Sequence, residues 1–164
     1  MYLIGDKVVH PMHGAGIIEE ITEERMGGIK HNYYVFRMLV NGLVLKFPVE
    51  NCDAIGIRAL YTISQIEEMM RHIPQLKVDM TTNWNRRYRE NMERIKSGEP
   101  LKVAQVVKSL MWRDKQRGLS NGERKMLHNA KQILLSEIVL VCQTNYADAE
   151  KHLNQTMMMG ASNA

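Results

Sequence analysis

The spacing of apolar residues changes part-way along the chain and divides it into two regions. Up to about residue 55, short apolar stretches are interrupted every few residues by glycine or proline, a pattern typical of β-strands joined by turns. From about residue 57 onward, apolar residues recur at intervals of three and four, which is the period of an amphipathic helix. The sequence therefore predicts a β region followed by an α region.

The clearest local signal in the β region is the pair Asn41-Gly42, which lies between the apolar stretches 32–40 and 43–47. An Asn-Gly pair suits the two positive φ angles of a type I′ turn, so these stretches are expected to form a hairpin. In the second strand Lys46 alternates with apolar neighbours and should face away from the core. With a further turn at Gly27-Gly28, these short strands predict a small, bent sheet or barrel of the SH3 or Tudor type.

Five helices are expected in the α region, and several have recognisable starts. Thr82 or Asn83 can cap the second helix, and Pro100 suits the first turn of the third. Ser120 and Glu123 have the spacing of a capping box for the fourth helix. The predicted helices cover about residues 63–73, 84–97 and 100–117, a fourth that starts after Ser120, and a short last one at 145–154.

No low-complexity linker separates the two regions, so the domain boundary is placed at the change of period. We expect an α+β protein of two domains. A Tudor- or SH3-like β-barrel would occupy residues 1–56 and an all-α helical domain of about five helices would occupy residues 57–156. Residues 157–164 would form a frayed tail.

The composition is that of a soluble globular protein. Of the 164 residues, 45% are hydrophobic and 24% are charged. No apolar run approaches the roughly 20 residues of a membrane span, so a cytoplasmic location is expected. The two cysteines, Cys52 and Cys142, are far apart among apolar neighbours, which favours buried free thiols over a disulfide framework.

Positive charge is concentrated in the α region. The formal net charge is +4, but residues 84–131 alone contain 13 basic and five acidic residues, a net charge of +8. Residues 1–60 contain six basic and seven acidic residues, a net charge of −1. A basic helical region of this kind is expected of a protein with a polyanionic partner, although a merely solvated helical surface has the same composition.

Candidate catalytic and metal-binding groups are sparse. His10 and His13 are spaced as His-x-x-His, but no third ligand is evident near them, so packing in a turn is favoured over zinc binding. No phosphate loop, pair of carboxylates or nucleophile with a base is evident in the sequence. We therefore expect neither an enzyme nor a bound cofactor or metal.

Trp84 stands at the expected start of a helix, and Arg86, Arg87 and Arg89 follow it closely. An aromatic ring beside guanidinium groups suits nucleic acid, because the ring can stack on or wedge beside a base while the arginines meet phosphates. The other interpretation is a buried helical face, since Trp84 begins a stripe at helical spacing that continues to Ile95. Trp84 would point elsewhere only if the helix began one residue later, and the spacing alone does not decide between the two.

Three motifs, in order along the chain, resemble the CarD family of bacterial transcription regulators, including its CdnL members, and the similarity covers about residues 3–150. The motifs are Gly5-Asp6-x-Val8-Val9-x-Pro11-x-His13-Gly14, Thr82-Asn83-Trp84-x-Arg86-Arg87-Tyr88-x-x-Asn91 and Arg113-Asp114-x-x-x-Gly118-Leu119-Ser120-x-Gly122-Glu123. The resemblance implies a regulator that binds RNA polymerase. It is expected to be a monomer in the bacterial cytoplasm.

By this resemblance, the N-terminal domain, shared with the transcription-repair coupling factor, would bind the lobe of the polymerase β subunit. The helical domain would contact promoter DNA, largely independently of sequence, at the upstream edge of the melted −10 region. Trp84 would wedge into the minor groove there and slow the collapse of the bubble, which stabilises the open complex. The implied DNA-binding residues are Trp84, Arg86, Arg87, Arg89 and Arg124.

The implied polymerase-binding residues are Lys46, Glu24 and Arg25. The sequence departs from the family pattern at two places in this domain. His10 stands where a tyrosine is expected, and Glu24 falls near a position that is often basic. These departures concern the details of the polymerase contact.

Two other functions fit parts of the sequence. The third and fourth helices could form a helix-turn-helix of a stand-alone, sequence-specific repressor, with Asn121, Arg124 and Lys125 reading bases in a major groove. The chain could also be a protein adaptor whose basic helices are only solvated. Tight binding to one operator without polymerase would favour the repressor.

Overall fold

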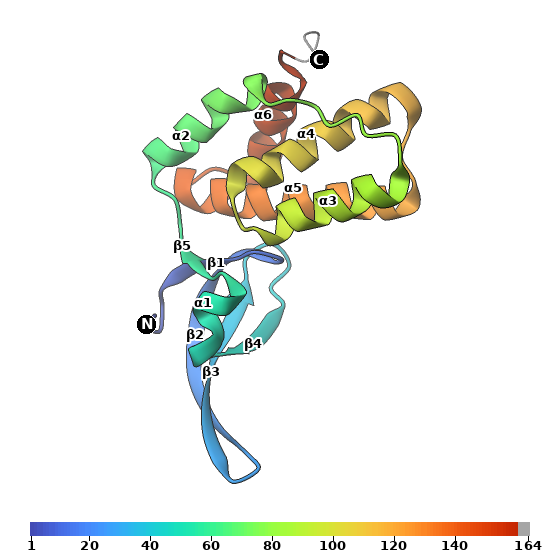
Figure 1. Ribbon diagram of the computed structural model, residues 1–164. Helices are drawn as coiled ribbons and strands as arrows, with labels where there is room; N and C mark the ends of the chain where they lie inside the picture. The colour runs from blue at the N-terminus through green and yellow to red at the C-terminus, as the bar shows by residue number, and fades with distance from the viewer. Residues whose placement is uncertain (161–164) are drawn as a thin grey trace.

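An antiparallel sheet near the N-terminus and a group of helices after it make up the computed structural model, which describes residues 1–160 (Figure 1). This arrangement confirms the predicted α+β class with two domains. The strands are β1 (Lys7–His10), β2 (Gly14–Met26), β3 (Ile29–Met38), β4 (Val44–Pro48) and β5 (Arg58–Ala59). Their order across the sheet is β4-β3-β2-β1-β5, so β4 and β5 lie at its two edges.

The sheet encloses its own apolar core, which is made mainly by alternate residues of β1 to β4. Tyr34 and Phe36 of β3 are fully buried there with Val8, Ile18 and Phe47. A register shift between Ile18 and Glu20 marks a bulge in β2, a feature that increases the bend of a strand. The short helices η1 (Val49–Asn51) and α1 (Cys52–Ile55) lead from β4 to β5.

The longest ladder in the sheet joins β2 to β3 and ends at Met26 opposite Ile29 (Figure 1). Gly27 and Gly28 form the predicted turn, with φ angles of 60° and 81°. Two successive positive φ angles are the requirement of a type I′ turn. This type of turn therefore occurs at Gly27-Gly28 and not at Asn41-Gly42, where it was predicted.

The predicted hairpin of β3 and β4 is confirmed, but its connection is a five-residue loop at residues 39–43. Gly42 has a φ of 69°, whereas Asn41 does not have a positive φ. The Asn41 side chain instead accepts a hydrogen bond from the Leu43 N–H at 3.0 Å, which closes the loop locally. Lys46 is exposed on β4, as predicted.

The sheet domain continues beyond its predicted end at residue 56. Ile57 is buried in the core of the sheet, and β5 pairs with Val8 and Val9 of β1. The change from strand to helix therefore falls after Ala59, three residues later than the change of apolar period indicated. The periodicity could not locate a strand of two residues because it is shorter than one alternation.

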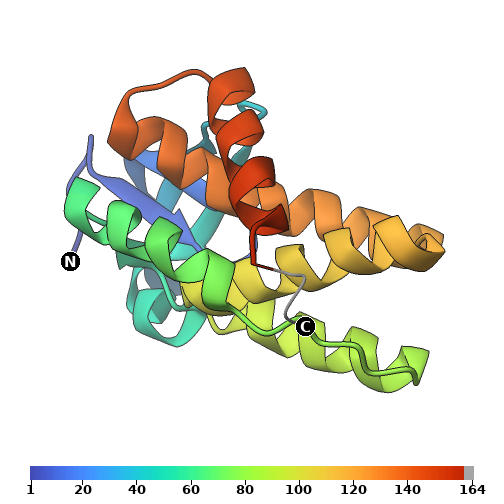
Figure 2. The same cartoon turned by 90° about the horizontal axis from the view of Figure 1, so that it is seen from above.

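Five α-helices follow the sheet within residues 1–160, as predicted: α2 (Ile63–His72), α3 (Trp84–Lys96), α4 (Pro100–Arg117), α5 (Asn121–Cys142) and α6 (Tyr146–Met158). α5 is the longest, and residues 133–138 in its middle are all buried. Six consecutive buried residues cover every side of a helix. Figures 1 and 2 show the cause, because α5 runs beside α4, is crossed by α6 and faces the sheet on its remaining side.

The end of the chain corrects one prediction. Met157, assigned to a frayed tail, is fully buried within α6, and its carbonyl oxygen accepts a hydrogen bond from Trp112 Nε1 at 3.2 Å. The tail was misplaced because α6 runs four residues beyond the predicted end at Asn154. Residues 161–164 of the predicted tail lie outside the described residues. None of the described helices is long and apolar enough to cross a membrane.

The two cysteines differ in exposure. Cys52 is a buried free thiol, as predicted, but Cys142 is exposed. Cys142 is the last residue of α5, where the helix leaves the core, so its apolar neighbours in sequence do not cover it. Burial raises the pKa of the Cys52 thiol.

The two histidines of the His-x-x-His segment lie together, with ring centroids 4.6 Å apart. His10 Nδ1 accepts a hydrogen bond from the Met12 N–H at 3.1 Å, and its ring faces Phe36 and Phe47. Across residues 1–160, no three histidine, cysteine, aspartate or glutamate side chains gather as a metal site. Burial, and then the neighbouring His13, lowers the pKa of His10 to about 4.

This lowered pKa predicts a stability that falls as the pH falls from 6.5 to about 4. In that range the unfolded chain binds a proton at His10 and the folded chain does not, so acid favours unfolding. His10→Asn keeps an acceptor for Met12 and should reduce the loss between about pH 7 and about pH 5, a range above the titration of most carboxyl groups. Urea unfolding of both proteins at the two pH values measures the difference. An equal loss in both proteins would contradict the assignment.

Candidate nucleic-acid interface

Trp84 is the first residue of α3 and is held from two sides. Asn83 caps the helix, because its side-chain oxygen accepts a hydrogen bond from the Arg86 N–H at 2.9 Å. The indole stacks on Tyr88 with ring centroids 5.0 Å apart and planes 17° apart, and Nε1 donates to Ser120 Oγ at 3.0 Å. Trp84 is nevertheless 41% exposed.

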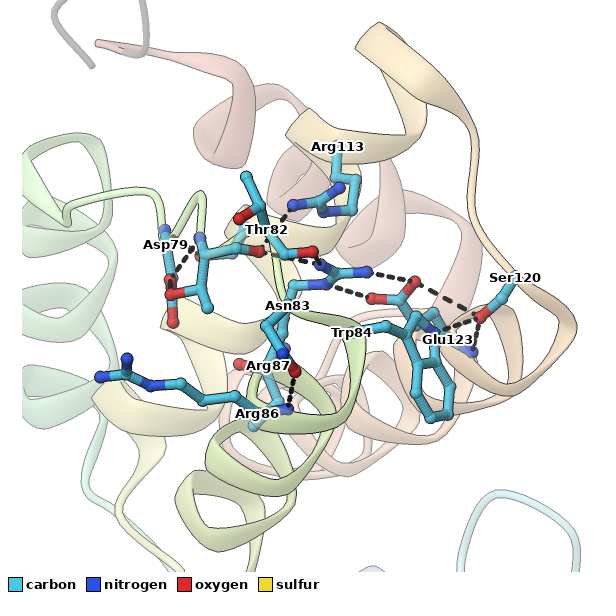
Figure 3. A network of polar contacts seen from close by, with 12 residues as sticks. Asp79, Thr82, Asn83, Trp84, Arg86, Arg87, Arg113, Ser120 and Glu123 are labelled. Atoms are coloured by element: carbon cyan, nitrogen blue, oxygen red, sulfur yellow. Dashed lines mark hydrogen bonds and ion pairs between the residues drawn. The ribbon is translucent and has the colours of Figure 1, made fainter.

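The buried-face interpretation of Trp84 therefore holds only for the inner side of the ring, and the nucleic-acid interpretation stays a prediction. The helix does include Trp84, and the predicted stripe with Tyr88 exists. The expectation that inclusion in the helix would bury the indole was wrong, because at the first turn few neighbours remain to cover its outer side. The result is a partly exposed indole whose orientation is restrained by the stack on Tyr88 and by the hydrogen bond to Ser120, which Figure 3 shows.

The first turn of α5 supports this ring. Ser120 caps α5 by accepting the Glu123 N–H at 3.2 Å, so one hydroxyl serves both the helix and the indole. A β-carbon on Gly122 would lie 3.6 Å from Cζ2 of Trp84 and 3.7 Å from Cε2 of Tyr88, which places both rings over that glycine. The entrances of α3 and α5 thus form one surface.

Only half of the predicted capping box is present. The Glu123 carboxylate binds Arg87 instead of turning back to the Ser120 N–H, with Nε to Oε2 at 2.7 Å and Nη2 to Oε1 at 3.2 Å (Figure 3). Burial alone would raise the pKa of the Glu123 carboxyl, but the hydrogen bond and charge of Arg87, helped by Ser120 and Arg113, hold this pKa below its usual value. The two side chains form a buried ion pair.

This pair corrects the assignment of Arg87 to DNA binding. Arg87 is 5% exposed, and its Nη1 also donates to the carbonyl oxygens of Thr81 and Thr82 at 2.8 and 3.2 Å. Its guanidinium group is occupied within the protein and is not available to a phosphate. Arg87 instead joins α3, α5 and the segment before Trp84.

That segment, residues 73–83, crosses α4 without regular structure after η2 (Ile73–Gln75), and we call it the strap (Figure 1). Its carbonyl groups are bound by side chains of α4. Lys108 Nζ donates to the carbonyl oxygens of Ile73, Pro74 and Leu76 at 2.9, 3.0 and 2.9 Å, and Arg113 Nη2 donates to that of Thr81 at 2.9 Å. The strap thereby fixes the approach of the chain to Trp84.

Asp79 is the acidic anchor of the strap. It accepts hydrogen bonds from the side chain and the main chain of Thr81 and from Arg94 of α3, and Ser109 Oγ accepts its N–H at 2.9 Å. Although burial would raise its pKa, these bonds to Thr81 and Arg94 lower the pKa of the Asp79 carboxyl to about 2. Asp79 is therefore charged at neutral pH.

The remaining arginines predicted to bind DNA are accessible. Arg86, with 65% of its side chain exposed, pairs with Glu90 one turn along α3, and Arg124, with 58% exposed, lies 3.9 Å from Asp114. Arg89 is also exposed. Exposed ion pairs of this kind are weak, so a phosphate can compete for the guanidinium groups.

Comparison with known proteins agrees with these features. Residues 2–61 match the family described as the CarD-like/TRCF RID domain, and residues 68–154 match the one described as CarD, C-terminal domain. The chain belongs to the CarD family. It is also 37% identical over 141 residues to YdeB of Bacillus subtilis (strain 168), a protein whose name proposes a transcription factor; the match covers 86% of this chain and 92% of YdeB.

The two CarD matches meet between residues 61 and 68, which is where the sheet domain ends and α2 begins. In the sheet domain of this CarD-family protein, Lys46 Nζ and Glu24 Oε1 form an ion pair at 2.7 Å across the face of the sheet. Arg25 follows Glu24 in β2, so its side chain is on the opposite face. The structure brings Lys46 and Glu24 together and leaves Arg25 apart.

Sequence reasoning missed the residues that hold this CarD site together, chiefly Lys108, Ser109 and Arg113. The sequence does contain a signal for them. Ser109 and Arg113 are four residues apart and so lie on one side of α4, and Lys108 stands among the apolar residues Val106, Val107 and Leu110. Polar side chains on an apolar helical face are rarely buried without partners. Their positions indicate that another segment supplies those partners, but the strap has no periodicity that would identify it.

Proposed function

We propose that this CarD-family transcription factor binds the β subunit of RNA polymerase through its sheet domain and stabilises the open promoter complex with Trp84 at the upstream edge of the −10 bubble. The observation that carries this proposal is the restrained, 41% exposed indole at the joined entrances of α3 and α5. Its outer side is free to enter a distorted base step, at an unstacking cost of a few kcal/mol. Arg86, Arg89 and Arg124 surround the same end of the domain and suit phosphates.

The open edge of the sheet supports the polymerase part of the proposal. Among the described strands, β4 pairs with β3 alone, so its outer edge carries main-chain groups without strand partners. Leu43 and Val44, where the loop enters β4, are 59% and 45% exposed. An exposed edge with apolar side chains beside it suits a partner that adds a strand, and the Lys46–Glu24 pair lies beside that edge.

Binding to polymerase compensates for weak binding to DNA. Three exposed arginines give a modest, salt-sensitive affinity for phosphates without base readout. Attachment to polymerase raises the effective concentration of Trp84 at the promoter. The open complex is then stabilised only by the amount by which the protein binds melted DNA better than duplex DNA. In this proposal the protein is not an enzyme.

The structure gives less support to a helix-turn-helix repressor. A recognition helix lies in a major groove with its N-terminal residues at the base edges, so its first turn must be free on that side. The first turn of α5 instead packs against α3, with Trp84 and Tyr88 over Gly122 and with Arg87 bound to Glu123. Asn121, Arg124 and Lys125 are exposed there and would reach DNA together with Trp84, on the same surface.

The lifetime of promoter open complexes tests the proposal. We expect the wild-type protein to lengthen the lifetime with its cognate polymerase, and Trp84→Ala to lose most of the gain while binding polymerase normally. A wedge worth about 1.4 kcal/mol corresponds to about a tenfold change. Ile63→Ala is the matched control, because it also removes an exposed apolar side chain, but from α2 and not from α3. Equal lifetimes with and without bound wild-type protein would contradict the proposal.

A further inference from the structure

The sheet domain and the helical domain meet along the middle of α5. Ser136 Oγ accepts a hydrogen bond from the Ala15 N–H of β2 at 2.9 Å and donates one to the Ile133 carbonyl oxygen at 2.8 Å. The hydroxyl is therefore both an acceptor and a donor. The contact is close, because a β-carbon on Gly14 would overlap Ser136 Oγ. Ala15 and Ser136 are both buried.

Glu137, the next residue of α5, makes the second connection. It is 3% exposed and accepts two hydrogen bonds from the guanidinium group of Arg58, at 2.8 and 2.7 Å. It also accepts the Tyr61 N–H at 2.8 Å, and the guanidinium group lies 4.6 Å from the centre of the Tyr61 ring. Arg58 belongs to β5, so this carboxylate ties the edge of the sheet and the connection to α2 to one helix.

The turn between β1 and β2 adds a third contact. Met12 packs against the core of the helical domain. A β-carbon on Gly98, which follows α3, would lie 3.7 Å from Pro11 of this turn. Hydrogen bonds, a buried ion pair and apolar packing therefore join the domains at separate points. Domains joined only by an exposed linker are expected to move relative to each other, and these contacts oppose such motion.

We infer that Ser136 and Glu137 are positioning residues that make the two domains one rigid body with a fixed span between β4 and Trp84. This inference rests on the proposed function for its purpose. Ser120, which caps the start of α5, accepts the hydrogen bond of the indole, and the two positioning residues follow it by 16 and 17 positions, about 24–26 Å along the helix. One continuous helix thus connects the candidate DNA surface to the sheet domain.

A rigid span has a direct effect on open-complex stabilisation. When the sheet domain is bound to polymerase, a fixed connection holds Trp84 at one place relative to the promoter. A hinged connection would spread Trp84 over many positions and lower its effective concentration at the base step. It would also add the entropic cost of ordering the two domains upon binding.

Pulsed electron paramagnetic resonance tests the rigidity. Spin labels on the exposed Cys142 and on Lys30→Cys in β3, with Cys52 replaced by alanine, report the distance between the domains. We expect one narrow distance distribution for this labelled protein. We expect a broad one when Ser136→Ala and Glu137→Ala are combined. A broad distribution before the substitutions, or a narrow one after them, would overturn the inference.

The lifetime of open complexes tests the purpose of the rigidity. The double variant should lose most of the lifetime gain while its affinity for polymerase stays within about twofold of the wild type. Glu137→Gln keeps an acceptor for the Tyr61 N–H, so it should retain an intermediate gain in the lifetime of open complexes. It serves as the test variant if the double variant does not fold. A full gain from a double variant with a broad distribution would overturn the inference. If the wild type itself gave no gain, the proposed function would fail while the distance measurement still decided the rigidity.

Discussion

Arg87→Ala is expected to lower the free energy of unfolding by about 3–5 kcal/mol, the usual cost of breaking a buried ion pair from one side. The substitution leaves the Glu123 carboxylate, with 3% of its side chain exposed, without the guanidinium group that binds it. It also leaves the Thr81 and Thr82 carbonyl oxygens without the donor at Nη1. Urea unfolding of the variant and the wild type at neutral pH gives the difference.

Arg86→Ala is the matched control, because it removes the same side chain from the adjacent position. Its pair with Glu90 is exposed, so the expected cost is much smaller than that of Arg87→Ala. The combination of Arg87→Met with Glu123→Leu should recover more than half of the loss, since it removes the unpaired charge and keeps the volume. Similar costs for Arg86→Ala and Arg87→Ala would show that the buried pair is not structural.

Gly16→Ala is expected to destabilise the sheet domain by about 3 kcal/mol, at the upper end of the range for overpacked cores. A β-carbon on Gly16 would overlap the Arg37 carbonyl oxygen and lie 2.5 Å from Cζ of Phe36. Neither neighbour can move easily. Arg37 is held in the ladder between β2 and β3, and Phe36 is fully buried in the core. The measurement is the urea unfolding transition.

Gly122→Ala is the control, because its expected effect on stability has the opposite sign to that of Gly16→Ala. Its new β-carbon would meet Trp84 and Tyr88 at ordinary contact distances of 3.6 and 3.7 Å. Alanine is also favoured over glycine within a helix by about 0.5–1 kcal/mol. We therefore expect a small gain in stability for Gly122→Ala. A loss comparable to that of Gly16→Ala would mean that the rings over Gly122 pack more tightly than the structure shows.

The elements that the sequence predicted well are those fixed by neighbours in the chain. Asn83 caps α3, Pro100 stands in the first turn of α4, and Ser120 caps α5, as expected. In each case the cause is local, because the main-chain groups of a helix end are satisfied within a few residues. The same holds for the turn at Gly27-Gly28, where glycine tolerates the required φ angles.

The predictions that failed depend on residues far apart in the sequence. Arg87 was assigned to DNA binding through the family resemblance, whereas its ion-pair partner in the structure, Glu123, lies 36 residues later. The helical phase held a hint, since Arg87 lies four residues before Asn91 and eight before Ile95, both of them buried. Met157 was similarly judged by its position near the end of the chain and not by the core that receives it.

The loop at Asn41-Gly42 shows a third limit on what can be predicted from the sequence. The dipeptide permits a type I′ turn, but the register of β3 on β4 leaves five residues to connect. Leu39 also donates its N–H to the Ala15 carbonyl oxygen at 3.2 Å, so the loop is tied to β2 as well as to its own strands. A local preference decides a turn only where the pairing of the strands leaves that choice open.

The strap has a bearing on how proteins of this family can diverge. Its main chain is held by Lys108 and Arg113 of α4, and a carbonyl oxygen is the same group whichever residue carries it. Substitutions at the exposed positions of the strap, Gln75, Lys77 and Met80, therefore leave the anchoring intact. A single inserted or deleted residue would instead shift every later carbonyl away from its donor. In related sequences these exposed positions should drift in composition while the length of the strap stays constant.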